Sequence, residues 1–335
     1  MSEEAAPPRR SLRADRWQQP RYRYRVALVL TLALIVVVMV SLPFALRSMR
    51  TQLFGEQTGD LYDLVSGRVL TPADAARELS QSFFNIGIVQ IDEGAQVVSL
   101  NISANRICAT TCPTLDVTLF AVANNAAVRR GLPPSVTVRL QPTDQLFMQT
   151  VQLPIRGQPS LYPFEIWQLW LGLTITDVRP DGTRVPMTVD ELPSRATFTL
   201  QNLLPDFLMA RPTPIAPQEV AAVHDPLPFA AVQGLTFTRP DYLKHLTLIL
   251  VVLITVSGLL AIFTRSIHEL VLGVGGLILG IWGVRSILVP QPVPTITAID
   301  LALSTVILLI LLGLAVRAAL HFHQRSELPW SRPRS

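Results

Sequence analysis

Residues that could support chemistry are scarce in this sequence. The only two cysteines, Cys108 and Cys112, are separated by Ala-Thr-Thr. Two thiols at this spacing could form a disulfide, stay reduced, or act as a redox or metal pair. A zinc site needs about four ligands, and the sequence places no histidine or second cysteine pair close by. We therefore expect a short structural disulfide, with free thiols and a redox or metal pair as the alternatives.

Known catalytic signatures are missing from the sequence. It contains no G-x-S-x-G, no P-loop, no G-x-G-x-x-G after a strand and no H-E-x-x-H. His321 and His323 follow an apolar run, and we interpret them as anchors at a membrane interface. Nothing singles out a paired-carboxylate site among the acidic residues of the central segment. We interpret these as solvated turn residues: Asp92, Glu93, Asp144, Asp181, Asp190 and Glu191. We predict no catalytic residue, no cofactor and no bound metal.

The stretch LYPFEIWQLWLGLTI, residues 161–175, combines a proline turn with two tryptophans. Proline fixes its own backbone and restrains the preceding residue to extended geometry. The aromatic side chains suit a position at a membrane surface. We predict a loop that couples an outer domain to membrane helices, with an acidic residue paired to an arginine. The alternative is a rigid core corner without membrane contact. The coupling candidates are Tyr162, Pro163, Phe164, Glu165 and Arg239.

The composition indicates the environment in which these residues must be positioned. Of the 335 residues, 49% are hydrophobic and only 16% are charged, whereas a soluble domain carries about a quarter charged residues. Four apolar runs are long enough to cross a bilayer, which takes roughly 20 helical residues: 26–46, 246–263, 270–288 and 298–316. The first run exceeds the roughly 7–15 residues of a signal-peptide core. A cleaved signal peptide and a buried soluble hairpin are therefore the weaker interpretations.

The arginines predict the orientation of these helices. They cluster before the first run, in residues 1–25, and after the last run, in residues 317–335. Basic flanks stay on the cytoplasmic side, although Arg47 and Arg50 argue weakly the other way. Both termini are thus predicted to be cytoplasmic, which requires an even number of crossings. Residues 51–241 would lie outside the cytoplasm. The arginines suit anionic lipid and lack the aromatic interleaving of a nucleic-acid surface, so the lipid bilayer is the predicted partner.

The segment between the first two runs has a β pattern. Apolar and polar residues alternate in 97–103, 116–122, 135–140 and 196–200, as in half-buried strands. Asp181 and Gly182 between strand-like runs indicate a hairpin. We predict a β-sandwich of about seven to nine short strands. The proline-rich segment 204–229 should run extended along its edge.

Two features of the last runs indicate helix packing. Glycines recur at helical spacing and would allow another helix, of this chain or of another copy, to approach closely. A chain of this kind could form a homo-oligomer or join a membrane complex through that face. Arg285 and Asp300 are predicted to form an ion pair near the outer surface; the alternative is that both reach the headgroups. The glycines are Gly273, Gly276, Gly280 and Gly283.

The whole layout resembles an uncharacterised bacterial membrane family known as domain of unknown function 4436. The resemblance covers about residues 26–319. It is carried by the Tyr-Pro-Phe-acid motif at 162–165, by Arg239-Pro240 before the second run, and by Arg285 with Pro290, Pro294 and Asp300. Glu165 stands where we would expect aspartate. The family has no assigned activity, so the resemblance implies architecture and a multi-pass place in the bacterial inner membrane, not a reaction.

A partial resemblance to pentameric ligand-gated ion channels implies a different function. Those channels also join an outer β-sandwich to helices through a Pro-Phe-Asp loop and an arginine. Here a helix precedes the β segment, and the run in the pore position is glycine and leucine from 270 to 281, whereas a conducting pore needs polar lining. We predict a non-catalytic membrane protein that displays its β domain for partner or envelope binding. A channel-like or receptor-like oligomer is the first alternative, and an envelope enzyme with an unrecognised site is the second.

Overall fold

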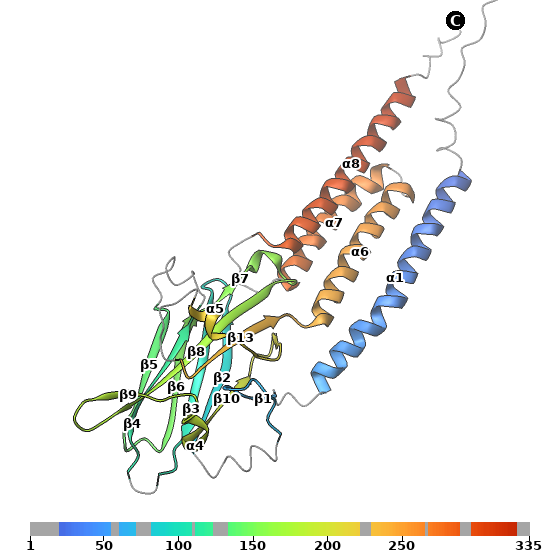
Figure 1. The fold of residues 1–335 in the computed structure, drawn as a ribbon. Coiled ribbons are helices and arrows are strands. Elements are labelled where there is room, and N and C mark those ends of the chain that lie inside the picture. The colour runs from blue at the N-terminus through green and yellow to red at the C-terminus, as the bar shows by residue number, and fades with distance from the viewer. Residues whose placement is uncertain are drawn as a thin grey trace, which may run out of the picture. The chain divides into compact units, whose positions relative to one another are not determined.

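The computed structural model describes residues 20–54, 60–71, 82–108, 111–122, 133–221, 229–264, 267–288 and 296–326. The chain divides into two compact units (Figure 1). The first unit contains the long helices from both ends of the chain, and the second contains the β strands. The proline-rich linker with Pro290 and Pro294, and most of both terminal tails, lie outside the described residues.

The helical unit contains α1 (Pro20–Phe54), α6 (Asp241–Thr264), α7 (Ile267–Leu288) and α8 (Ala298–Ser326). Within the described residues, three helices include a stretch long and apolar enough to cross a membrane: Arg25–Phe44, Asp241–Ile262 and Ala298–His323. A helix suits lipid because it satisfies its own backbone hydrogen bonds. Threonine hydroxyls in these helices are also hydrogen-bonded within the helix. Those of Thr31, Thr255 and Thr305 each donate to a carbonyl four residues earlier.

The prediction of a third full span at 270–288 falls on helix α7. This helix has 22 residues, with Glu269 in its first turn and Arg285 in its last. Within the described residues its apolar stretch is Leu272–Ser286, which includes Arg285 and is shorter than the three spanning candidates. A crossing by α7 therefore stays a prediction.

Helices α6, α7 and α8 pack around a small core formed by Ile262, Val274, Val306 and Ile310. Glycines allow close approach here: a Cβ on Gly258 would lie 2.6 Å from an Ile310 atom, and one on Gly313 would lie 2.6 Å from an Ile262 atom. The predicted stripe on α7 is not used in this way. No described atom lies within 4 Å of a Cβ built on Gly276, Gly280 or Gly283, and Gly273 is exposed.

The β-rich unit consists of two sheets. The five-stranded sheet has the order β1 (Leu61–Asp63), β10 (Ala196–Asn202), β2 (Ser82–Asp92), β3 (Val97–Asn105) and β6 (Leu146–Pro154). The second has the order β11 (Leu208–Met209), β13 (Ala231–Thr238), β8 (Ile166–Val178), β4 (Thr114–Ala121) and β5 (Ser135–Leu140). Short strands extend it: β12 (Thr213–Pro214) beside β13, and β7 (Arg156–Gly157) and β9 (Arg184–Pro186) beside β8. Three short helices connect strands: η2 (Pro159–Leu161), α4 (Leu192–Arg195) and α5 (Pro217–Ala221).

Two strand pairings join distant parts of the sequence. Strand β10 lies parallel to β2, with Ala196 opposite Ser82 and Asn202 opposite Ile88. Strand β13 lies antiparallel to the long strand β8, from Ala231 opposite Leu173 to Thr238 opposite Ile166. The second register brings the start of β8 beside the end of β13, which is the position of the candidate site described below.

Both sheets contribute to one hydrophobic core. Phe84 of β2 and Phe198 of β10 stack with ring centroids 4.5 Å apart. Leu119 of β4 and Phe237 of β13, from the second sheet, belong to the same buried cluster. Trp167 at the start of β8 is fully buried. Alternation along each strand therefore directs apolar residues from both sheets into a shared interior.

The strand predictions compare well with this arrangement. The alternating segments 97–103, 116–122, 135–140 and 196–200 fall in β3, β4, β5 and β10, with boundaries shifted by at most two residues. Gly182 has φ +85° in the turn between β8 and β9, as a hairpin glycine requires. The proline-rich segment contributes β11 and β12 at the edge beside β13, as an extended segment would. Its residues Pro217–Ala221 instead form α5, and 222–228 lie outside the described residues. The sequence does not predict the shortest strands individually. These have only two or three residues, too few for an alternating pattern: β1, β7, β9, β11 and β12.

One glycine is predicted to be irreplaceable. A Cβ on Gly157 of β7 would lie 2.2 Å from the Trp167 ring. We expect Gly157→Ala to lower the stability of the β-rich unit by about 1–3 kcal/mol, because the ring has no room to move in a close-packed core. Thermal unfolding of the purified chain, followed by near-ultraviolet circular dichroism, measures this. Gly275→Ala is the control, because a Cβ there meets no described atom within 4 Å; equal midpoints for the two variants would contradict the prediction.

Candidate functional site: a buried arginine with two carboxylates

The candidate site lies where three strands end. Arg239 follows β13, Glu165 precedes β8, and Glu93 follows β2. Because Thr238 lies opposite Ile166 in the β13–β8 ladder, the residues just beyond that pair are brought together. The Arg239 Nε donates to Glu165 Oε1 at 2.6 Å, and its Nη2 donates to Glu93 Oε1. One guanidinium thus joins the ends of strands from both sheets.

Arg239 is almost completely removed from solvent. Its side chain is 5% exposed, that of Glu93 is 13% exposed, and that of Glu165 is fully buried. The guanidinium carbon lies 4.1 Å from the centroid of the Phe207 ring and 5.1 Å from that of Tyr162. Aromatic faces attract a cation when water is excluded. The rings and carboxylates together compensate a charge that could not otherwise be buried.

The charges of the site do not cancel, because two carboxylates face one guanidinium. Each carboxylate also has a second oxygen, Oε2, that is buried without a hydrogen-bond partner among the described residues. Burial raises the pKa of Glu93; Arg239 opposes this shift, and the neighbouring negative charge of Glu165 reinforces it. A proton on Glu93 would leave one negative charge against one positive charge.

The neighbouring groups respond to the same environment. Burial raises the pKa of Tyr162 to about 12, so its hydroxyl stays protonated. Burial alone would lower the pKa of Arg239, but Glu93 and the hydrogen bond to Glu165 outweigh it and raise that pKa. Asp206 adds a further negative potential to the cluster. Arg239 therefore keeps its positive charge, and the raised pKa of Glu93 favours its protonated form.

The segment 162–165 has a mixed exposure that its sequence does not reveal. Tyr162 is 3% exposed and Glu165 fully buried, whereas Phe164 is 51% exposed. The peptide bond between Tyr162 and Pro163 is cis. Leu161 and Ile166 on either side are also exposed, at 44% and 51%. The segment thus directs its polar partner inward and leaves apolar side chains on the surface.

The structure brings together several residues that the sequence analysis singled out. Cys108 and Cys112 form a disulfide with their Cα atoms 5.3 Å apart. In the helical unit, Arg285 Nη2 donates to Asp300 Oδ2 at 3.2 Å, and Arg285 Nε contacts Oδ1 of the same carboxylate. The described residues contain no group of three or more side chains able to hold a metal ion.

Sequence reasoning missed two members of the site. Glu93 is interpreted above as a solvated turn residue, but the structure places it against Arg239 with only 13% of its side chain exposed. Phe207 lies in a proline-rich segment without periodicity, and yet it is buried beside the guanidinium. Both belong to loops that only the strand topology brings to the end of β13. No local pattern in the sequence could have identified them.

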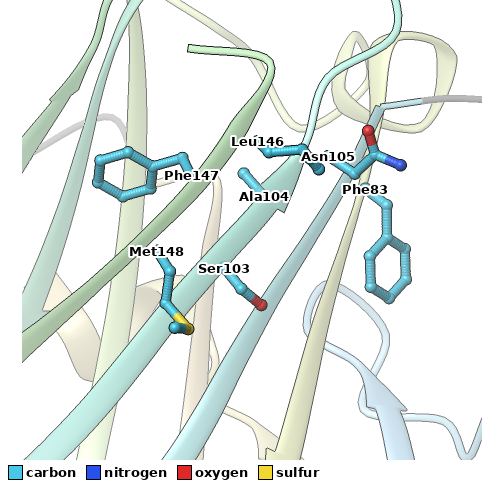
Figure 2. Close-up of a pocket in the computed structure, with 7 residues that line it drawn as sticks. All are labelled: Phe83, Ser103, Ala104, Asn105, Leu146, Phe147 and Met148. Carbon is cyan, nitrogen blue, oxygen red and sulfur yellow. The ribbon is translucent and has the colours of Figure 1, made fainter.

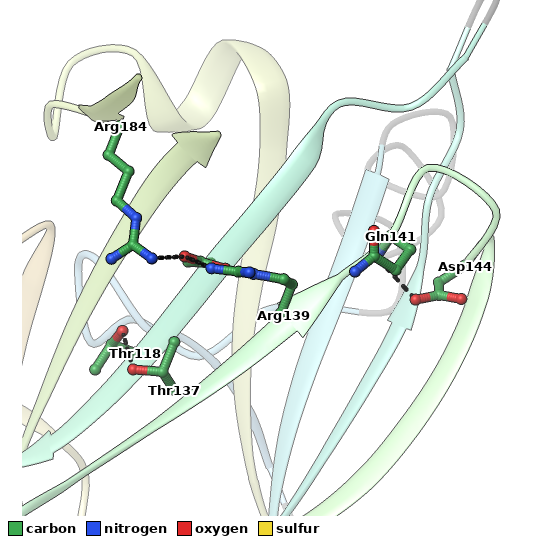
Figure 3. Close-up of polar contacts among 7 residues, drawn as sticks. Thr118, Thr137, Arg139, Gln141, Asp144 and Arg184 are labelled. Atoms are coloured by element: carbon green, nitrogen blue, oxygen red, sulfur yellow. Dashed lines mark hydrogen bonds and ion pairs between the residues drawn. The ribbon is translucent and has the colours of Figure 1, made fainter. Parts of the chain in front are cut away.

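A second arginine–carboxylate pair provides a contrast within the same unit. Arg139 of β5 donates to Asp116 of β4 through Nε at 2.7 Å and Nη2 at 2.9 Å, and Arg184 lies 3.9 Å from Asp116 (Figure 3). The hydrogen bond from Arg139 lowers the pKa of Asp116. The Arg139 side chain is 47% exposed, so water reaches its guanidinium, although the Asp116 side chain is only 6% exposed. Its geometry resembles that of the buried cluster, but its surroundings differ.

A comparison with models of known protein families found no match. A comparison with curated protein sequences also found no match. The two resemblances drawn from the sequence therefore stay predictions. What can be concluded about function follows from the chain itself.

We predict that Arg239→Gln destabilises the β-rich unit by about 3–5 kcal/mol, because it leaves buried carboxylates without a compensating charge. Chemical denaturation of the purified chain measures this loss. Arg139→Gln is the matched control. Arg139 also makes two hydrogen bonds to one carboxylate, but its side chain is 47% exposed and Arg184 stays 3.9 Å from the same Asp116 carboxylate, so this change should cost less. Similar losses in the two variants would show that the buried cluster contributes no more than a surface pair.

The raised pKa of Glu93 predicts a pH dependence of stability. Its protonated form is favoured in the folded state, so the contribution is complete below the ordinary value of 4.5 and is lost as pH rises through the folded pKa. Glu93→Gln keeps the acceptor oxygen and removes the titration. Relative to the unmodified chain, this variant should therefore gain stability as pH is raised from 4.5 towards 8. Glu219→Gln, on the exposed face of α5, should show no such trend; parallel curves for Glu93→Gln and the unmodified chain would exclude the assignment.

Proposed function

We propose that this chain is a non-catalytic, multi-pass inner-membrane protein that displays a β-sandwich outside the cytoplasm for binding a partner or envelope component. The observation that carries the proposal is the order of the elements. The β-rich unit lies in the sequence between the apolar helices α1 and α6. A domain between two crossings is held at one membrane face, and the basic ends of the chain favour the cytoplasmic side for both termini.

Four crossings fit this placement. Even crossing number requires α7 to span as well, and its 22 residues reach about 33 Å at 1.5 Å per residue, close to the hydrocarbon thickness. Its two charges can be accommodated near the ends of the helix, where Arg285 contacts Asp300. The Cys108–Cys112 disulfide also suits an oxidising compartment outside the cytoplasm.

A binding role is favoured over a catalytic one by the environment of the charged cluster. Arg239 and Glu165 are too buried to meet a substrate, so the cluster fits a structural task. It joins strands of both sheets and leaves the outer surfaces of the β domain available for recognition. Catalytic groups, by contrast, must touch the reacting atoms.

A receptor-like oligomer is the second candidate, and the connection at Arg239 favours it. Pro240 alone separates Arg239 from Asp241, the first residue of α6. The exposed Leu161, Phe164 and Ile166 beside Glu165 provide an apolar surface suited to a membrane interface. Movement of segment 162–165 would then reach Arg239 through its ion pair with Glu165, and α6 through the chain at Arg239 and Pro240. This candidate assigns coupling to Tyr162, Pro163, Phe164, Glu165 and Arg239.

The proposed placement predicts which thiols react from outside the cell. The chain has only the two cysteines of the disulfide, so an introduced cysteine is the single free thiol. Asp190→Cys, on an exposed turn, should react with a membrane-impermeant maleimide in intact spheroplasts. Ser335→Cys should react only after lysis. The reverse pattern, or equal reaction of both before lysis, would disprove the placement.

Reconstitution of the purified chain in liposomes separates the two candidate functions. A protein that only binds a partner should give no ion flux. Fivefold assembly, detected by cross-linking in native membranes, together with flux would favour the receptor-like oligomer instead.

A further inference from the structure

The edges of the two sheets differ in how well they are protected against pairing with another chain. Exposed edges are usually shortened, charged or interrupted by proline. Strand β11 has two residues, and β1 has three, including Asp63. Strand β5 carries Arg139. The side strands carry Arg156 in β7, Arg184 and Pro186 in β9, and Pro214 in β12.

Strand β6 has none of these protections along most of its length. It spans nine residues, Leu146–Pro154, without a charged side chain and with proline only at the end. It pairs with β3 in unbroken register from Leu146 opposite Asn105 to Pro154 opposite Val97. Its other side pairs with no described strand. In an antiparallel ladder every second residue turns its N–H and C=O away from the partner, so β6 offers backbone groups for a further strand.

Apolar side chains surround this edge. Leu146 is 81% exposed and Met148 is 73% exposed. Together with Phe83 and Phe147 they line a groove of about 370 Å³ that lies across β2, β3 and the start of β6, next to the free edge (Figure 2). Its polar lining, Ser103 and Asn105, is uncharged. Large exposed apolar side chains next to unpaired backbone groups are typical of a surface that another chain covers.

We propose that β6 is a self-association edge, at which a second copy of this chain adds its own β6 in antiparallel orientation. Because β6 is uncharged, two identical strands meet without like-charge repulsion. The inference rests on the proposed function, because copies anchored in the same membrane present their β domains on the same side of it.

Cysteine cross-linking of the full chain in native membranes tests the proposal. Two identical antiparallel strands related by a twofold axis place one residue opposite itself, with Cα atoms about 4.5–5.5 Å apart, within disulfide range. Met148→Cys, Gln149→Cys, Thr150→Cys and Gln152→Cys are tested singly under mild oxidation. One of these exposed positions should give a dimer in high yield, and its neighbours should give less. Thr137→Cys, an exposed threonine on edge strand β5, should stay monomeric.

A charge placed on the edge gives an independent measurement. Thr150→Lys should reduce the dimer fraction, determined by light scattering in mild detergent, by roughly tenfold or more, because it puts like charges near one another in the paired edges. Thr137→Lys should leave that fraction unchanged. An unaltered thermal midpoint for both variants shows that the fold is retained.

Two results would overturn the self-association edge. The first is that none of the four cysteine positions cross-links, and the second is that β6 cross-links to a different protein. The accessibility of the same cysteines, reduced and labelled from outside intact spheroplasts, tests the placement separately. Labelling without dimers would remove the self-association edge and leave the proposed function intact, whereas labelling only after lysis would remove both.

Discussion

A buried positive charge requires nearby negative charge, and this requirement organises one end of the β domain. Arg239 is held between Glu165 and Glu93 and lies against Phe207 and Tyr162. Removing Arg239 would leave two carboxylates in the interior without a compensating positive charge. The ends of β2, β8 and β13 are therefore fixed to one another by electrostatics as well as by the hydrophobic core. Arg239 follows β13 directly, and α6 begins two residues later, so the same constraint fixes the point at which the chain leaves the β-rich unit.

Much of this architecture could be predicted because it depends on periodicity. Apolar runs predict helices, and the alternation in 97–103 and 135–140 predicts β3 and β5. The pairing of Glu165 with Arg239 could be suspected from a proline turn and an arginine before an apolar run. Glu93 could not, because its position against Arg239 depends on how the two sheets pack. The pairing of Arg285 with Asp300 could be predicted because both charges flank apolar runs that are adjacent in the sequence.

The two arginine pairs of the domain show why charge alone does not define a site. Arg139 and Arg239 both hold carboxylates at hydrogen-bond distance. Water reaches the guanidinium of Arg139 and is excluded from that of Arg239, so the charges around Arg239 must be balanced by groups of the domain itself. Binding surfaces are more readily found where polar protection is missing, as along β6. Burial thus separates the part of the domain that maintains its shape from the part available to other molecules.

The parallel pairing of β2 with β10 has a consequence for biosynthesis. Thr199 donates to the carbonyl of Phe84, 115 residues earlier in the chain. At about 5–20 residues per second, translation separates the two by roughly 6–23 seconds. During that interval β2 has been synthesised but β10 has not, so one edge of β2 is unpaired in the nascent domain. A nascent chain that stops at this stage would therefore present β2 with only one of the two neighbours that it has in the folded sheet.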